Sequence, residues 1–306
     1  MIPSPPRNLR RVNDGRAGLR GGRRCGEVST CMRKLLLSLW MLAAAIGCAA
    51  DVKTVHFQSE DHHTRLVGYL FEPTGHGPHA AIVLLHGRAG PYSSLAKGVY
   101  TAATLSKRHK EWGAFWAERG YYALLVDSFG PRGYPAGFPA GSYADRPAEV
   151  SEQTVRPLDA YAALAYLRAQ GDVIADRIGV QGWSNGGMTV LATMSDQAPA
   201  KPSSGFRAAL AEYPGCAMDA VKGEYHSYAP ILLLIAADDE EVSPKRCEQF
   251  AKRAVGAGSP LESHVYPGAA HNYDDPGAKK QSVPANRQAT EDTFRRAGAF
   301  FARQLQ

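Results

Sequence analysis

The sequence predicts an α/β fold with a mostly parallel sheet and helices on both of its faces. Apolar runs that suit strands alternate with helical patterns from residue 80 to residue 306. Two of these runs, residues 80–85 and 231–236, are continuous, which is typical of strands buried on both faces. The chain has 306 residues, of which 44% are hydrophobic, and no shift in composition marks a second domain. We therefore expect a single domain over residues 51–306.

The N-terminal residues are expected to lie outside this domain. Residues 1–50 carry nine basic and two acidic side chains, whereas residues 51–306 carry 26 basic and 27 acidic ones. The net charge of +6 thus comes from the leader, and the nearly neutral remainder indicates no nucleic-acid partner. Residues 1–31 are rich in Arg, Gly and Pro without apolar periodicity, so we expect them to be disordered, or untranslated if Met32 is the start.

Residues 32–50 have the pattern of a secretory signal peptide. Two basic residues precede a mostly apolar, uncharged run at residues 35–47, and small residues follow it. This run is too short for a membrane span, which needs about 20 residues. Residues 45–48 also resemble a bacterial lipoprotein cleavage box, so lipidation at Cys48 and plain cleavage near Ala50 are both open. Either route predicts a periplasmic or secreted protein, and only the lipidated form would contact a membrane.

The first half of the domain is expected to contain a hairpin followed by strands and helices. Two extended runs flank a polar turn, which favours an antiparallel hairpin. Residues 91–107 and 131–150 are expected to be loops that shape a binding pocket, and the second is long enough to cover a site. The expected strands are residues 52–57, 65–71, 80–85 and 121–126, and the expected helices are about residues 108–119 and 152–168.

The second half continues the alternation of strand and helix. A strand around Val180 leads into a helix that starts near Met188. The further elements expected are strands at residues 207–212, 231–236 and 261–266 and helices near residues 244–255 and 290–303.

A sharp turn joins the strand around Val180 to the helix after it. Its sequence, residues 182–187, is Gly-Trp-Ser-Asn-Gly-Gly, with glycines where the backbone must turn tightly. Ser184 is the centre of a G-x-S-x-G pattern, in which a strained turn exposes a serine hydroxyl above the sheet. A serine hydroxyl is a weak nucleophile at neutral pH. It therefore needs a histidine to accept its proton and a carboxylate to orient that histidine.

Candidates for both partners follow the last two expected strands. Asp238 and Asp239 come after the strand at residues 231–236, and His271 follows the next strand. Because the carboxyl ends of parallel strands meet in one crevice, these side chains can reach Ser184. The chain order of serine, acid and histidine is the order found in α/β-hydrolase enzymes.

A negatively charged tetrahedral intermediate would need two hydrogen-bond donors. We expect one to be the backbone amide of Asn185, next to the nucleophile. The other is expected from the loop after the strand at residues 80–85, at the amide of Arg88. The guanidinium of Arg88 is either solvated or available to bind an anionic substrate, and the sequence leaves both interpretations open.

Five segments of the chain resemble the dienelactone hydrolase family of the α/β-hydrolases. They are HGRAG (86–90), DSFGPRG (127–133), DRIGVQGWSNGG (176–187), DDEEVSP (238–244) and YPGAAHNYD (266–274). The similarity extends from about residue 53 to residue 304. The resemblance implies an α/β-hydrolase fold with an eight-stranded sheet, esterase-type chemistry, and no cofactor or metal. Ser184 stands where the enzymes that open dienelactones carry cysteine, so a dienelactone substrate does not follow.

The resemblance also separates the two aspartates. It implies a small residue three positions before the acid and an apolar residue three positions after it. Ala236 and Val242 stand at these distances from Asp239. We therefore assign the acid to Asp239 and treat Asp238 as a solvated neighbour or a support for the acid.

Two cysteines, Cys216 and Cys247, remain when the leader is set aside. Both follow neighbouring strands at the crevice end of the sheet. In an oxidising compartment they could form a disulfide, and the alternative is two buried free thiols.

Together these features predict a secreted serine hydrolase that cleaves a small-molecule ester or lactone through an acyl-enzyme. We assign Arg132 and Trp183, which lie in two of the matching segments, to substrate binding. One alternative is a small peptidase of the same fold. Another is a lipoprotein that uses the fold to bind a ligand without catalysis, although the complete set of Ser184, Asp239 and His271 favours an enzyme.

Overall fold

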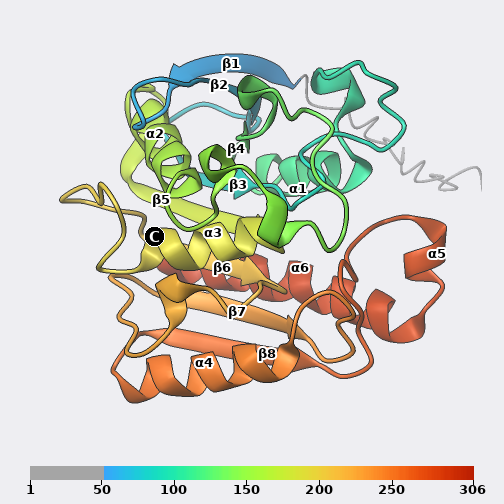
Figure 1. The fold of residues 1–306 in the computed structure, drawn as a ribbon. Coiled ribbons are helices and arrows are strands. Elements are labelled where there is room, and N and C mark those ends of the chain that lie inside the picture. Colours follow the sequence, from blue (N-terminus) through green and yellow to red (C-terminus); the bar gives the residue numbers. More distant parts are fainter. Residues whose placement is uncertain (1–51) are drawn as a thin grey trace, which may run out of the picture. The chain divides into compact units, whose positions relative to one another are not determined.

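The computed structural model describes residues 52–306, which contain an eight-stranded sheet (Figure 1). The expected disordered segment, signal peptide and lipidation site lie outside the described residues. The strand order is β1-β2-β4-β3-β5-β6-β7-β8, and β1 and β2 are antiparallel to their neighbours whereas the others run parallel. The strands are β1 (Lys53–Gln58), β2 (Arg65–Phe71), β3 (His79–Leu85), β4 (Tyr122–Asp127), β5 (Val173–Trp183), β6 (Ala208–Glu212), β7 (Ile231–Ala236) and β8 (Leu261–Tyr266).

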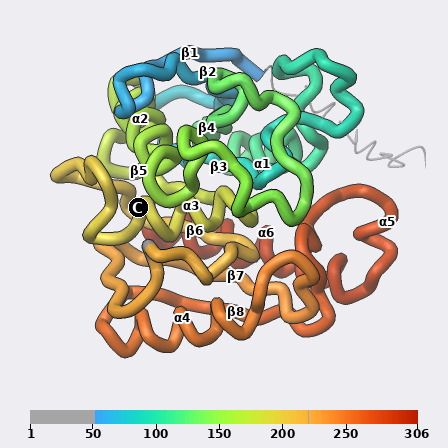
Figure 2. Tube along the Cα trace, in the orientation of Figure 1, coloured from blue at the N-terminus to red at the C-terminus, as the bar shows by residue number. Residues whose placement is uncertain are grey.

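Six α-helices accompany the sheet in the described part of the chain, and they cover both of its faces (Figures 1 and 2). α2, α3 and α4 contribute apolar side chains to the core on one face, and α1 and α6 contribute to the core on the other. The predicted α/β fold, with a mostly parallel eight-stranded sheet between helices, is confirmed. The helices are α1 (Lys107–Ala117), α2 (Arg156–Arg168), α3 (Asn185–Met194), α4 (Pro244–Gly256), α5 (Ala278–Gln281) and α6 (Pro284–Gln304).

Side chains of the central strands alternate between the two cores. In β3, Val83 and Leu85 belong to the core under α2 and α3, whereas Ile82 and Leu84 belong to the core under α1 and α6. Such strands read as continuous apolar runs because both of their faces are buried. This is why the sequence indicated them clearly.

Three helix starts differ from the sequence prediction. α2 begins at Arg156 instead of residue 152, α3 at Asn185 instead of near Met188, and α6 at Pro284 instead of residue 290. α2 and α6 carry proline in their first turn, where its missing N–H has no helical partner to lose and its fixed φ suits the helix. None of the described helices is long and apolar enough to cross a membrane.

The two predicted loops are largely irregular. Residues 91–107 contain one 3₁₀ turn, Ala102–Thr104. The loop after β4 contains three, namely Gly130–Arg132, Tyr143–Asp145 and Ala148–Val150. This second loop passes close to the carboxyl ends of the central strands, where the candidate site is found.

Candidate active site

Ser184 sits at the junction of β5 and α3 with an unusual backbone conformation. Its φ is 51° and its ψ is −112°, which is strained for a residue with a side chain. The surrounding glycines make this turn possible. A Cβ atom on Gly186 would lie 1.8 Å from the carbonyl oxygen of Leu85, and one on Gly182 would lie 2.3 Å from that of Gly186. Only glycine fits either position, so the local sequence permits the tight turn that presents Ser184.

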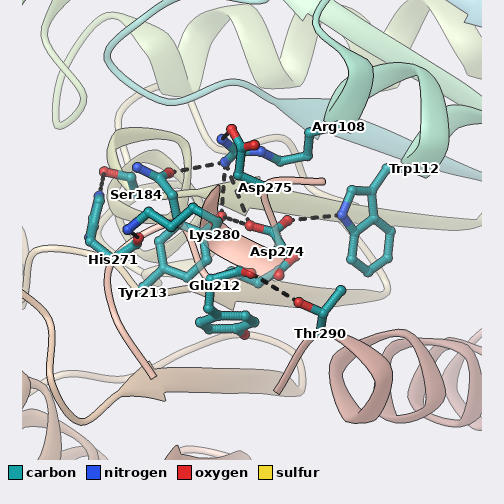
Figure 3. Close-up of polar contacts among 12 residues, drawn as sticks. Arg108, Trp112, Ser184, Glu212, Tyr213, His271, Asp274, Asp275, Lys280 and Thr290 are labelled. Atoms are coloured by element: carbon teal, nitrogen blue, oxygen red, sulfur yellow. Dashed lines mark hydrogen bonds and ion pairs between the residues drawn. The ribbon is translucent and has the colours of Figure 1, made fainter. Parts of the chain in front are cut away.

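His271 connects Ser184 to Asp239 through two hydrogen bonds. Its Nε2 lies 2.9 Å from Oγ of Ser184, a contact that Figure 3 marks, and its Nδ1 lies 2.7 Å from Oδ2 of Asp239. The side chains of His271 and Asp239 are both 1% exposed. Since a carboxylate only accepts hydrogen bonds, Nδ1 of His271 donates and Nε2 is left to accept the serine proton.

Asp239 is held by the loop that carries it. Its Oδ1 accepts hydrogen bonds from the amides of Glu241 and Val242, at 2.9 and 2.8 Å. The neighbouring Asp238 is exposed, and its own amide donates to the carbonyl of Ala269. Of the two aspartates that the sequence offered, Asp239 is therefore the one whose carboxylate contacts His271.

The two predicted oxyanion donors belong to backbone segments next to Ser184. Asn185 is the first residue of α3, and the first amides of a helix have no partner within it. Arg88 follows Gly87, where an added Cβ atom would lie 3.6 Å from Cβ of Ser184, so this loop passes beside Ser184. Both backbone segments therefore lie next to Ser184, where the mechanism expected from the sequence needs its two donors.

The side chain of Arg88 forms a bidentate ion pair with Glu241. Nε and Nη2 of Arg88 donate to the two carboxylate oxygens at 2.8 and 2.7 Å, and both side chains are 24% exposed. The hydrogen bonds from Arg88 lower the pKa of Glu241, against the opposing effect of burial. Oε2 of Glu241 also lies 3.7 Å from Nε2 of His271. The guanidinium of Arg88 is thus paired with Glu241. It is neither simply solvated nor free to bind an anionic substrate, which were the two interpretations left open by the sequence.

A cavity of about 600 Å³ opens at Ser184. The predicted loop at residues 131–150 contributes Ala140, Gly141, Tyr143 and Arg146, whereas residues 91–107 contribute nothing. The expectation that both loops shape the pocket is therefore wrong for residues 91–107, whose Tyr92, Ala96 and Leu105 pack into the core under α1 instead. The remaining lining residues come from other segments: Arg88; Gln153; Ser184, Asn185 and Met188; Gly215–Asp219 and Lys222; and Glu240–Ser243 and Arg246.

Comparison with known proteins identifies the family. A sequence profile of the dienelactone hydrolase family matches residues 66–305. The chain belongs to the dienelactone hydrolase family. It is a hydrolase that acts on ester bonds.

Solved structures with the same fold include three that resemble this dienelactone hydrolase family member. A Klebsiella pneumoniae protein provisionally named a dienelactone hydrolase has 17% identity and a TM-score of 0.61, with 82% of this chain and 98% of that one covered. A dienelactone hydrolase-like promiscuous phosphotriesterase from metagenomic libraries has 19% identity and a TM-score of 0.60, covering 83% and 99%. An esterase of Pyrococcus furiosus has 18% identity and a TM-score of 0.57, covering 84% and 94%.

Arg132 and Trp183, which we assigned to substrate binding from the sequence, do not line the cavity of this family member. Arg132 is 5% exposed and bonds to Asp61 and Asp159, so it ties the β1–β2 turn to α2. Trp183 is fully buried and packs against the rings of Trp112 and His109. As the last residue of β5, it points to the face of the sheet opposite α3. We therefore withdraw both assignments, because each side chain serves the packing of the fold.

His86 has a structural part in the same loop as Arg88. It is fully buried, and burial lowers its pKa well below the usual range, so the ring is neutral. Nε2 accepts a hydrogen bond from the amide of Ser128 at 3.2 Å, and Nδ1 donates to the carbonyl of Gly87 at 2.7 Å. His86 thus fixes the backbone just before Arg88.

A buried polar network lies behind the ring of His271 (Figure 3). Arg108 donates to Tyr213 and to Asn272, at 3.0 Å each, and Tyr213 donates to Asp274. The ring of Tyr213 meets that of His271 edge to face, with centroids 5.1 Å apart. This network packs one side of the imidazole. No sequence pattern indicated it, because its members come from separate elements and share no spacing.

Glu212, the last residue of β6, contacts the backbone of Ser184. Its carbonyl accepts the amide of Ser184 at 2.9 Å, and its side chain accepts from Gln181. Burial, reinforced by the nearby Asp274, raises the pKa of Glu212 well above its usual range. Burial thus disfavours a negative charge on this carboxyl, while the backbone of Glu212 supports the turn at Ser184.

A disulfide joins Cys216 to Cys247, with Cα atoms 5.0 Å apart. It ties the loop after β6, which lines the cavity, to α4, which follows the acid loop. Of the two states that the sequence left open, the structure has the paired one. Among residues 52–306, no group of three or more His, Cys, Asp or Glu side chains is placed to hold a metal ion.

Proposed function

We propose that this family member is a serine hydrolase that cleaves small-molecule esters or lactones through an acyl-enzyme. One observation carries the proposal. A continuous chain of hydrogen bonds runs from Oγ of Ser184 through His271 to the buried carboxylate of Asp239, at the edge of the cavity. Serine, histidine and aspartate in this arrangement are suited to acyl transfer.

In the acylation step, Oγ of Ser184 attacks the ester carbonyl while Nε2 of His271 takes the serine proton. The carbonyl oxygen becomes an oxyanion, which we expect the amides of Asn185 and Arg88 to stabilise. The C–O bond to the alcohol then breaks, and the imidazolium returns its proton to the leaving oxygen. Asp239 stabilises the imidazolium and holds its tautomer.

Deacylation repeats these events with water as the nucleophile. Nε2 of His271 takes a proton from the water, which attacks the acyl carbonyl bound to Ser184. Collapse of the second tetrahedral intermediate releases the acid and restores the serine hydroxyl. For a lactone, the alcohol released in the first step remains part of the same molecule as the acyl group.

The cavity supports a small substrate. Its volume of about 600 Å³ falls within the range of small-molecule sites, roughly 300–1,000 Å³. Apolar side chains such as Met188, Met218 and Val242 line it together with charged ones. Several of these charged groups already have partners, as Arg88 has Glu241 and Arg146 has Glu152. An uncharged ester of moderate size fits these surroundings.

Labelling with a fluorophosphonate probe, followed by a panel of esters and lactones of graded size, tests the proposal. We expect covalent labelling at Ser184 and turnover of part of the panel. Ser184→Ala should lose labelling and lower kcat by about 10⁴-fold or more. Absence of labelling in folded protein would favour a non-catalytic binding protein, and cleavage of amides in preference to esters would favour a peptidase.

We further propose that the protein is exported, on the basis of the signal-like residues 32–50. The Cys216–Cys247 disulfide supports this proposal, since disulfides persist mainly in oxidising compartments. Mass spectrometry of the protein from an expressing bacterium should find a mature N-terminus near Asp51 or an acylated Cys48 in the envelope fraction. A chain that begins at Met1 in the cytoplasmic fraction would contradict export.

A further inference from the structure

The main chain of His271 is held by two side chains of opposite charge. Its N–H donates to Oε2 of Glu240 at 2.9 Å, and its carbonyl oxygen accepts a hydrogen bond from Nζ of Lys280 at 2.6 Å. Lys280 and Glu240 also contact each other, with Nζ and Oε1 3.1 Å apart. Figure 3 shows the side chain of Lys280 beside His271. The three residues form a closed ring of contacts, which we term the histidine clamp.

The position of His271 in the chain explains why such contacts matter. It lies between β8 and α5, outside the hydrogen-bond ladders of the sheet and the helices. The next residue, Asn272, has a left-handed backbone with a φ of 56°. Peptide groups in such a segment lack hydrogen-bond partners from a sheet or helix, yet buried peptide groups almost always have a partner. For His271, the side chains of Glu240 and Lys280 are these partners.

The clamp also joins the two loops that carry the proposed base and acid. Glu240 follows Asp239 directly, so the acid loop contacts His271 at two points, at the ring through Asp239 and at the main chain through Glu240. Lys280, from α5, closes the clamp on the other side. A ring fixed at Nδ1 alone can still tilt about that hydrogen bond. Holding the backbone as well restricts where Nε2 can point.

We propose that Glu240 and Lys280 are positioning residues that keep Nε2 of His271 aimed at Ser184 by fixing the histidine's main chain. The proposal rests on the proposed acyl-transfer function of Ser184, His271 and Asp239. The clamp is partly in solvent, with side-chain exposures of 30% for Lys280 and 55% for Glu240. Exposed ion pairs contribute little to the free energy of folding, so its effect is expected on the reaction instead.

Other charged and polar groups face His271 and remain in place when the clamp is removed. Asp239 binds Nδ1, and Glu241, neutralised by Arg88, lies 3.7 Å from Nε2. Tyr213 packs against the ring, and Arg108 holds Tyr213 and Asn272 from α1. These groups contact the ring of His271 and the neighbouring Asn272, whereas the clamp contacts the peptide groups of His271.

The test uses Lys280→Met and Glu240→Ala, which remove the two halves of the clamp, in the full-length protein with its best ester substrate. Because a misplacement of about 1 Å can cost about 10²-fold in rate, we expect kcat to fall by roughly 10- to 100-fold in each variant with KM within about twofold. The kcat of the double variant should lie no more than about twofold below that of the slower single variant, since the two residues act as one unit.

Conservative and neighbouring variants serve as controls. Lys280→Arg and Glu240→Gln keep a donor and an acceptor for His271, so each should recover kcat to within about threefold of the unchanged protein. Lys279→Met removes an exposed lysine next to Lys280 in α5 and should leave kcat within about twofold. A loss of the same size in Lys279→Met would assign the effect to α5 as a whole and overturn the proposal.

A spectroscopic readout separates this proposal from the proposed function. The N–H proton between Nδ1 of His271 and Asp239 gives a low-field NMR signal, whose sharpness depends on how well the ring is held. We expect it to broaden in Lys280→Met and Glu240→Ala and to stay sharp in Lys279→Met, whether or not the protein cleaves esters. A sharp signal in all variants, or kcat of Lys280→Met within about twofold of the unchanged protein, would overturn the proposal.

Discussion

Arg146 donates a hydrogen bond from Nη1 to Oδ1 of Asn185 at 2.8 Å. This contact links the loop at residues 131–150 to the residue after Ser184. The same loop reaches the other predicted oxyanion donor, because the amide of Phe138 donates to the carbonyl of Arg88 at 2.8 Å. The guanidinium of Arg146 also stands over the ring of Phe138, 5.4 Å from its centroid. One loop therefore lines the cavity and contacts both residues expected to stabilise the oxyanion.

The first prediction is that removing Arg146 weakens catalysis more than it weakens binding. Arg146→Met alone would leave the carboxylate of Glu152, 4% exposed, without its cation, so the test uses Arg146→Met together with Glu152→Gln. Loss of the bond to Asn185 should let the amide of that residue shift. We expect kcat to fall by about tenfold or more with KM changed by less than about threefold, since an oxyanion donor acts mainly in the transition state.

The matched control is Arg207→Met, which removes an exposed arginine at the amino end of β6, the end of the strand opposite the site. Its kcat should stay within about twofold of the unchanged protein. Equal kcat in the Arg146 and Arg207 variants would show that the loop does not help to place Asn185.

The candidate site could be predicted from the sequence where local chemistry decides it. Ser184 is marked by glycines whose backbone neighbours leave no room for a Cβ atom. Asp239 and His271 follow strands that are recognisable as apolar runs, and the carboxyl ends of parallel strands must meet. In each case a short stretch of sequence fixes both the element and the place of the side chain on it.

Long-range contacts could not be predicted in this way. Arg132 bonds to Asp61 and Asp159, which are 71 and 27 residues away in the chain, and no spacing relates the three. Trp183 precedes Ser184, yet alternation along β5 directs its side chain into the core under α1 and α6. Arg146 and Lys280 were missed because each acts from an irregular segment or a helix of one turn.

The second prediction concerns the two neighbouring aspartates. Asp239→Asn should lower kcat by about 10⁴-fold, because an amide in place of the carboxylate favours the wrong imidazole tautomer. Asp238→Asn serves as the matched control and should cost less than about tenfold, since that side chain is exposed. Both variants are compared on one substrate under the same conditions. The reverse ranking would move the catalytic acid to Asp238.

The third prediction concerns the Cys216–Cys247 disulfide, whose cysteines are 31 residues apart. Closing a loop of this length should stabilise the fold by about 3–4 kcal/mol in the chain-entropy account. We expect a corresponding drop in the free energy of unfolding by urea when a thiol reductant is added. The variant with both cysteines changed to alanine should be insensitive to the reductant. An equal drop in the two proteins would show that the reductant lowers stability by a route other than this disulfide.

The fourth prediction is a pH dependence of stability that comes from His109. This side chain, on α1, is 4% exposed, and burial together with the nearby Arg108 lowers its pKa to about 3. The pKa of an unfolded histidine is about 6.5. Below that pH the imidazole of His109 therefore binds a proton in the unfolded chain but not in the folded protein. The contribution of His109 to stability is complete above about pH 6.5 and is lost as the pH falls toward 3.

Comparison of the unchanged protein with His109→Gln isolates this contribution. Burial also lowers the pKa of His86 and raises that of Glu212, with opposite effects on stability, but both groups are common to the two proteins and cancel in the difference. At pH 7.5 the variant should be the less stable of the two, because Gln fits the contacts with Pro91 and Trp183 poorly. As the pH falls to 5, the difference in free energy of unfolding between the two proteins should shrink by about 2 kcal/mol. This is the effect of one proton that only the unfolded chain binds, over about 1.5 pH units.

Urea unfolding at both pH values measures this difference, with His76→Gln as a control for loss of an exposed imidazole. A gap that stays the same at pH 7.5 and pH 5 would mean that His109 takes up its proton equally in the folded and unfolded chains, and that its burial does not hold it neutral.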